Sequence, residues 1–111
     1  MSAAAGIRIR RDTNRLELTF EDGRLIALPA EFLRVMAPAP PGKSTPLLGG
    51  KRRVGLLAAQ PVGNYALRLQ FSDGFDGGIY SWDFLEELGR EQSIRWRRYL
   101  RLLEDAGMSR D

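Results

Sequence analysis

Two stretches of the chain alternate apolar and polar residues and end in the same Asp-Gly pair. Residues 16–23 read Leu-Glu-Leu-Thr-Phe-Glu-Asp-Gly, and residues 67–74 read Leu-Arg-Leu-Gln-Phe-Ser-Asp-Gly. A period of two predicts a strand with one buried face, and Asp-Gly accepts the dihedral angles of a tight turn. Each stretch therefore predicts a β-hairpin, with return strands over 24–28 and 77–82. Duplication explains the likeness less well than convergence, because half-buried strands entering two-residue turns share this pattern.

The same alternation predicts further strands. Ile7 and Ile9 alternate with arginines, so a strand is expected there. An apolar strand is expected over 53–60, followed by a turn at 61–64. The strand after this turn is expected to begin at Tyr65, with its ring on the buried face.

Three helices are expected from capping residues and from apolar spacings of three and four. Pro29 is expected to start the first, which Pro38 ends. Asp83 is expected to cap the second, which Gly89 stops, and the third spans about 91–106. Their inward-facing residues are expected to be Phe32, Leu33, Met36, Phe84, Leu85, Leu88, Trp96, Tyr99, Leu100 and Leu103.

These elements predict an α+β fold. It consists of a small antiparallel-rich β-sheet built from hairpins, a short helix after the first sheet region and a C-terminal helix pair. The length of 111 residues, with 43% hydrophobic and 28% charged residues, fits a single domain over 1–111. Residues 37–53 are rich in Pro and Gly, which predicts a long mobile loop. Gly42-Lys43-Ser44 matches the end of a phosphate-binding loop, but its leading glycine is replaced by Ala37, so a solvated loop is preferred.

Composition removes several classes of chemistry. The chain contains neither Cys nor His. Disulfides, Cys and His metal ligands, a Cys nucleophile and a His general base are therefore excluded within it. Carboxylate, Lys, Tyr and Ser chemistry remains. Asp73 and Asp76 form a candidate pair for a hard cation, although a turn role is the more common one for such carboxylates.

The expected C-terminal helix is basic, while the net charge of the whole chain is only +3. Its cations interleave with aromatic residues, as in nucleic-acid contacts. Acidic residues share the helix, so a solvated amphipathic surface is preferred over nucleic-acid binding or docking of an acidic protein. No run of about 18 apolar residues predicts a membrane span, and a soluble cytoplasmic protein is expected. The basic residues are Arg95, Arg97, Arg98 and Arg101, and the acidic ones are Glu91, Glu104 and Asp105.

Four short motifs occur in order along the chain. They are Leu33-Arg34, Val62-Gly-Asn-Tyr-Ala-Leu67, Phe71-Ser-Asp-Gly74 and Gly78-Ile-Tyr-Ser-Trp82, with Leu85 and Leu88 beyond. Together they resemble the gamma-butyrobetaine hydroxylase-like N-terminal domain family, in its short free-standing bacterial form. The likeness covers about 16–89 and implies a small α+β domain.

The resemblance also identifies the positions in this chain that correspond to the zinc ligands of the family. In the hydroxylases this domain precedes an iron and 2-oxoglutarate-dependent catalytic domain, which is not expected here, and carries zinc on three Cys and one His. The resemblance places these ligand positions on Ala37, Ala39, Gly42 and Phe75, whose side chains cannot coordinate metal. We therefore expect a degenerate zinc site, no cofactor and no enzyme activity.

Relatives fused to or beside iron–sulfur carrier proteins imply an adaptor role. The expected function is a non-enzymatic interaction or scaffold module with an unknown protein partner, as an accessory to iron–sulfur or oxidoreductase proteins. Its rivals are nucleic-acid binding through the Arg-rich helix and a small carboxylate- and Tyr-based enzyme or ligand-binding protein. Burial is the preferred alternative for Tyr80 and Trp82, and inward packing onto the proline-rich loop is preferred for Phe75. The candidate partner surface comprises Phe75, Tyr80, Trp82, Lys51, Arg52, Arg53, Arg95 and Arg98.

Overall fold

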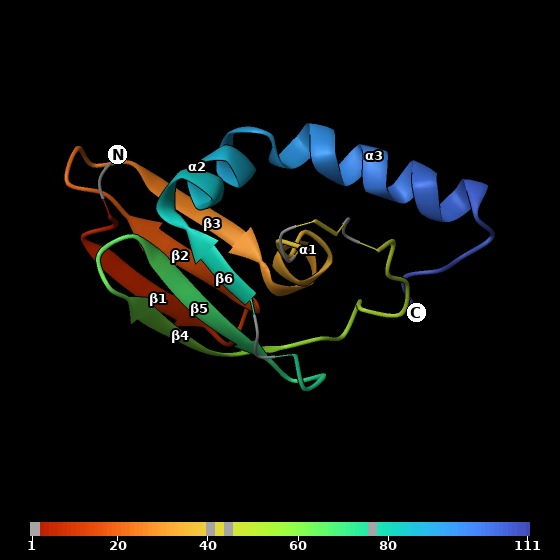
Figure 1. Cartoon of the computed structure of the whole chain (residues 1–111), viewed down its shortest axis with the longest axis horizontal. Helices are drawn as coiled ribbons and strands as arrows, with labels where there is room; N and C mark the ends of the chain where they lie inside the picture. Colours follow the sequence, from red (N-terminus) through yellow and green to blue (C-terminus); the bar gives the residue numbers. More distant parts are fainter. Residues whose placement is uncertain (1–2, 40–41, 44–45, 76–77) are drawn as a thin grey trace.

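The computed structural model describes residues 3–39, 42–43, 46–75 and 78–111. Its strands form two antiparallel sheets of three, ordered β1-β2-β3 and β4-β5-β6 (Figure 1). β1 and β4 lie beside each other, so the two sheets adjoin. This confirms the predicted α+β fold built from hairpins. The strands are β1 Gly6–Arg10, β2 Arg15–Thr19, β3 Leu25–Pro29, β4 Leu56–Val62, β5 Ala66–Phe71 and β6 Gly78–Ser81.

The two Asp-Gly turns have the same backbone structure. Gly23 has φ of 90° and Gly74 has φ of 91°, a region that favours glycine. In the first turn the Phe20 N–H donates to the Arg24 carbonyl at 2.9 Å, and in the second the Phe71 N–H donates to the Phe75 carbonyl at 2.9 Å. Both predicted hairpin turns are therefore confirmed.

The main core lies between the sheets and the helices. The alternating residues of β2 and β5 point into it, as predicted, whereas Tyr65 is 59% exposed. The expectation for Tyr65 is wrong because β4 continues through Pro61 and Val62, which moves the turn to residues 63–65. Proline is tolerated there because β4 is an edge strand of its sheet. The largest fully buried side chains are Tyr80, Phe32, Phe71, Leu16, Leu18, Leu28, Leu33, Leu67, Leu69, Leu85 and Leu88.

The helices are α1 Ala30–Val35, α2 Trp82–Arg90 and α3 Gln92–Asp105. The Ser81 hydroxyl oxygen accepts from the Phe84 N–H at 3.1 Å, so Ser81 rather than Asp83 caps α2. Gly89 does not stop this helix. A Cβ there would lie 2.9 Å from Cγ2 of Ile26, so Gly89 permits close packing of α2 on β3.

α3 extends from the rest of the molecule along one side (Figure 1). Tyr99 and Leu103 are buried as predicted, but Leu100 is 37% exposed, which contradicts its predicted inward position. The bounds of α3 agree with the predicted range of about 91–106 to one residue at each end. In the described residues, each helix is too short or too polar to cross a bilayer.

The second half of the predicted mobile loop is anchored. Leu47 and Leu48 pack against the cluster of Val35, Tyr99 and Leu103. The Gly50 N–H donates to the Ser109 carbonyl at 2.9 Å, and the Arg52 N–H donates to the Arg110 carbonyl at 3.0 Å. Residues 46–53 are therefore fixed against α3 and the segment that follows it, so the prediction of a mobile loop is wrong there.

The phosphate-loop hypothesis falls in the first half of the same segment. Gly42 is exposed with φ of 81°, and Ser44 lies outside the described residues.

Candidate functional site

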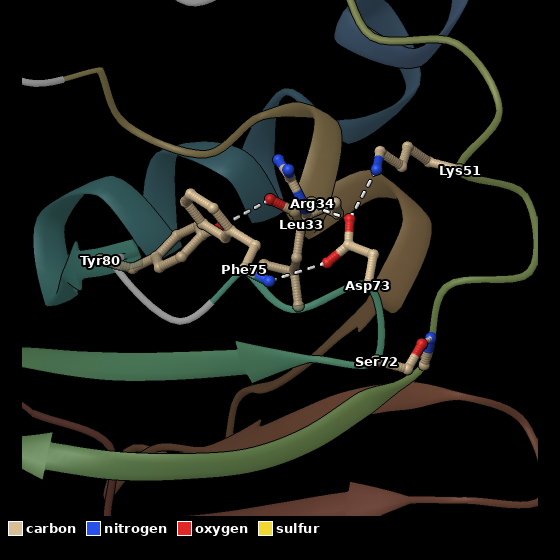
Figure 2. Close-up of polar contacts among 8 residues, drawn as sticks. Leu33, Arg34, Lys51, Ser72, Asp73, Phe75 and Tyr80 are labelled. Carbon is tan, nitrogen blue, oxygen red and sulfur yellow. Dashed lines mark hydrogen bonds and ion pairs between the residues drawn. The ribbon is translucent and has the colours of Figure 1, made fainter.

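The tip of the β5–β6 hairpin meets the end of α1 at Phe75. This ring is half-buried against the core. Arg34 lies beside this ring (Figure 2). The Arg34 guanidinium carbon is 4.0 Å from the Phe75 centroid, and the Phe71 centroid is 6.1 Å away. A Cβ on Gly78 would approach Phe75 to 2.9 Å, so the glycine makes room for the ring. Phe75 therefore packs inward as preferred, but its ring contacts are with Arg34 and Phe71, and packing onto the proline-rich loop stays a prediction.

Asp73 is the polar centre of this tip. Its Oδ2 accepts from Arg34 Nε at 2.8 Å and from Lys51 Nζ at 2.7 Å, and its Oδ1 accepts from the Phe75 N–H at 3.1 Å (Figure 2). The carboxylate side chain is 18% exposed. The Asp73 side chain therefore joins α1, the hairpin tip and residues 46–53, which we call the anchored segment.

The electrostatics of Asp73 follow from these donors. Burial alone would raise the pKa of Asp73, but hydrogen bonds from Lys51, the Phe75 backbone and Arg34 outweigh it and lower that pKa below its usual value. The carboxylate is ionised at neutral pH and is engaged by internal donors. Asp76, the other half of the cation-pair hypothesis, lies outside the described residues. Among those that are described, no three His, Cys, Asp or Glu side chains cluster to hold a metal.

Tyr80 and Trp82 belong to the core. Tyr80 is fully buried, and its hydroxyl donates to the Leu33 carbonyl in α1 (Figure 2). Burial raises the pKa of Tyr80, so the phenol stays protonated in the folded chain. Trp82 is 5% exposed. Burial, the preferred alternative, is therefore correct for both residues, and neither contributes to an exposed partner surface.

The four degenerate ligand positions differ in their surroundings. Ala37 is buried just after α1, and its N–H donates to the Arg34 carbonyl at 3.4 Å. Ala39 is half-buried, and Gly42 is exposed. Arg34 links two of these positions, because its carbonyl accepts from Ala37 while its guanidinium covers Phe75. Cation–π packing and ion pairs fix this region.

The remaining predicted partner residues fall into two groups. Lys51 is bound to Asp73, and Arg52 lies 3.5 Å from the Asp111 carboxylate. With Arg53, Arg52 lines a depression beside the C-terminal segment. The second group is on α3, where Arg95 donates to Glu87 at 2.7 Å and to Glu91 at 2.9 Å, and Arg98 is exposed. The predicted residues therefore do not form one continuous site.

Glu31 and Arg110 form an ion pair that was not predicted from the sequence. Glu31 is 7% exposed, and both of its oxygens accept from Arg110, at 2.9 and 2.6 Å. The Arg110 guanidinium carbon also lies 5.1 Å from the Trp96 ring centroid. A single Glu inside the otherwise apolar start of α1 was the available signal, since a buried carboxylate needs a charged partner.

A groove between α1, the anchored segment and α3 was also missed. Its volume is about 210 Å³. It has an apolar floor and two guanidinium groups at its α3 side. Its lining residues are Val35, Met36, Pro46, Leu47, Arg95, Arg98, Tyr99 and Leu102.

The fold and this site define a small α+β domain whose hairpin tip is held by ion pairs and aromatic contacts. Residues 7–86 match the family described as gamma-butyrobetaine hydroxylase-like, N-terminal, and the chain belongs to this family. This confirms the predicted resemblance. No curated protein sequence matches the chain.

The solved structures that resemble the chain include the following three. A solution NMR structure is 39% identical, with a TM-score of 0.89, covering 100% of this chain and 91% of its own. A second one is 36% identical, with a TM-score of 0.87, covering 99% and 86%. A crystal structure from Acidithiobacillus ferrooxidans ATCC 23270 is 34% identical, with a TM-score of 0.67, covering 78% and 91%. That last protein is described as one of unknown function in the DUF971 family.

Proposed function

We propose that the chain is a non-enzymatic interaction module of the cytoplasm whose family zinc site has been lost. One observation carries this proposal, namely that the polar groups at the hairpin tip are already hydrogen-bonded within the chain. Asp73 is held by Arg34 and Lys51, and the Tyr80 hydroxyl is buried on Leu33. An acid, base or nucleophile must instead reach a substrate. The tip therefore supports a structural role.

The residues present do not fit the zinc ion that the family implies. Zinc needs Cys, His or carboxylate ligands, and Ala37, Ala39, Gly42 and Phe75 supply none of them. The segments that a metal ion would join are instead connected by Asp73 and by the Arg34–Phe75 contact. Lost ligands and a replacement set of contacts are consistent with a domain that keeps its shape for binding.

The partner class we propose is an iron–sulfur or oxidoreductase protein. The family is described as gamma-butyrobetaine hydroxylase-like, N-terminal, and the sequence resemblance implies that in the hydroxylases this domain precedes a catalytic domain. A domain that adjoins an enzyme in one chain can act on a separate one through the same surface. The chain itself supplies no Cys to ligate a cluster, so its role would be contact with the protein.

Nucleic-acid binding is the second candidate, because Arg97, Arg98 and Arg101 are exposed on α3. The third hypothesis, carboxylate and Tyr catalysis, gains no support from Tyr80, whose buried phenol is already bonded. The salt dependence of binding distinguishes the protein-interaction function from nucleic-acid binding. Affinity for nucleic acid falls steeply as salt rises because counterions are released, whereas an apolar protein interface depends on salt far less.

The test is purification of the tagged full chain from its native cells, followed by reconstitution with each purified co-eluting protein. The proposal expects a complex of defined stoichiometry by titration calorimetry that persists at moderate salt. Failure of every co-eluting protein to reconstitute would refute it. Binding that RNA displaces and moderate salt abolishes would support the nucleic-acid function instead.

A further inference from the structure

The groove between α1, residues 46–47 and α3 combines an apolar floor with cations. Val35 and Tyr99 are buried at its base, and Leu47 is half-buried at one side. Its volume of about 210 Å³ suits one or two side chains rather than a cofactor. The groove rests on segments fixed by the Tyr99 hydroxyl, which donates to the Leu48 carbonyl.

The rim of the groove continues onto the exposed side of α3. Ile94 is 55% exposed and Leu102 is 48% exposed. With Arg98 they occupy positions four residues apart, which places all three on one face of the helix. Single exposed apolar residues are ordinary, but two in register beside an apolar groove form a continuous surface of the kind that a partner covers.

This face carries an exposed guanidinium, that of Arg98. Arg95 is bound to Glu87 and Glu91, whereas Arg98 has no ion pair with any residue that the structure describes. The acidic residues Glu104 and Asp105 lie in the last turn of the helix, six and seven residues after Arg98. A carboxylate from outside would therefore meet a guanidinium with no competing internal partner, and Arg binds carboxylates with two parallel hydrogen bonds.

We propose that this groove binds a peptide segment of a partner protein that carries an apolar side chain and, three or four residues away, a carboxylate. The apolar side chain would enter between Leu47 and Leu102, and the carboxylate would pair with Arg98. The inference rests on the interaction-module function proposed above and specifies where its partner docks and what chemistry the partner carries.

Other occupants fit the same face less well. A second copy related by a two-fold axis through α3 would bring the Arg98 groups of both copies together, and like charges at close range repel. Nucleic acid would gain from Arg98 but would leave Ile94 and Leu102 against its phosphates. An acidic amphipathic peptide satisfies both the apolar and the charged part.

The test is selection of a random linear peptide library against the full chain, with counter-selection against the double variant Arg98→Glu/Leu102→Ser. Enriched peptides should share an apolar residue and an Asp or Glu at the stated spacing. Each single variant, Arg98→Glu or Leu102→Ser, should weaken peptide binding by about tenfold or more, as measured by fluorescence anisotropy. Arg97→Glu is the matched control, because Arg97 is exposed on the same helix but does not line the groove. Its charge reversal should weaken binding less than threefold, roughly.

Circular dichroism and thermal melts of the variants verify that they are folded, as expected for exposed positions. The inference is overturned by an empty selection, by peptides that bind the variants as well as the native chain, or by a basic consensus. It is also overturned if sedimentation shows a dimer that Leu102→Ser dissolves, or if RNA competes with the peptides.

Failure of this inference can be told from failure of the proposed function. A reconstituted native partner that binds Arg98→Glu and the native chain equally well refutes the groove but keeps the interaction module. If no native partner reconstitutes, the module itself is refuted, whatever the peptides do.

Discussion

The guanidinium of Arg34 stacks over the ring of Phe75, with its central carbon 4.0 Å from the ring centroid. The same group donates its Nε hydrogen bond to Asp73 at 2.8 Å. One arginine at the end of α1 therefore binds both the apolar and the polar side of the β5–β6 tip. This double contact is the basis of the first two predictions.

Phe75→Ala should lower the free energy of unfolding by about 1 to 2 kcal/mol. The ring is half-buried, so part of the burial energy of a Phe is lost together with the cation–π contact. The free energy of unfolding of Phe75→Leu should lie between those of Phe75→Ala and the native chain, because leucine keeps the apolar contact but lacks the π face. Urea melts measure this, with Tyr65→Ala as the exposed control, expected within about 0.5 kcal/mol of the native chain. A change near zero in Phe75→Ala would show that the ring does not stabilise the tip.

Asp73→Asn should reduce stability at neutral pH and flatten its acid dependence. The pKa of Asp73 is lowered in the folded chain, so the unfolded state binds more protons in acid. The stabilisation is present above the unfolded pKa near 3.8 and is lost as the pH falls through the folded pKa. Loss of hydrogen bonds to a charged group should cost about 1 to 3 kcal/mol at pH 7. Equilibrium melts from neutral to acid pH should show the two stability curves converging, and parallel curves would contradict this assignment.

Removal of Arg110 alone should lower the free energy of unfolding more than removal of both charges of the Glu31–Arg110 pair. Arg110→Ala leaves the carboxylate of Glu31 buried and uncompensated, for an expected loss of about 2 kcal/mol, because Arg110 itself is partly exposed. The double variant Glu31→Gln/Arg110→Ala should be more stable than Arg110→Ala. A double-mutant cycle measures the coupling, with Arg52→Ala as the exposed control. Additive effects would exclude a direct interaction.

Gly89→Ala should destabilise the chain although alanine is the better helix former. The helix preference favours Ala by roughly 1 kcal/mol, but the new Cβ would lie 2.9 Å from Ile26 Cγ2. Overpacking of this kind costs about 1 to 3 kcal/mol. In an Ile26→Ala background the obstruction is gone, so Gly89→Ala should become stabilising. Thermal melts of the four proteins check the change of sign, and the same sign in both backgrounds would contradict it.

Metal removal should have no effect on the purified chain. The positions Ala37, Ala39, Gly42 and Phe75 lack ligand atoms, so no folding energy depends on a structural ion. Elemental analysis should find no stoichiometric zinc or iron, and a chelator should leave the thermal midpoint unchanged. One tightly bound zinc ion per chain would contradict this.

The hairpins and helices could be predicted because their signals are local. Alternation in β2 and β5, the Asp-Gly turns and the apolar spacing of α3 each act over a few residues. Tyr65 was misplaced because β4 ends two residues later than predicted, which moves the following turn. The role of Gly89 was predicted wrongly because it depends on close packing against Ile26, a residue distant in sequence.

The candidate site was harder to predict because ion pairs join distant segments. Asp73 gave a turn signal, but its partners Arg34 and Lys51 lie 39 and 22 residues away in sequence. Glu31 and Arg110 are 79 residues apart. The groove has no sequence signal of its own, since Leu47 sits in a Pro- and Gly-rich segment that composition alone indicates to be mobile.

The hydrogen bond from the Tyr80 hydroxyl to the Leu33 carbonyl makes alkaline unfolding and phenolate formation a single event for this residue. Burial raises the pKa of Tyr80, so the folded chain retains this proton where an unfolded tyrosine, near pH 10, releases it. Stability is therefore complete below that pH and declines above it. Ionisation of Tyr80 consequently accompanies the opening of the core itself.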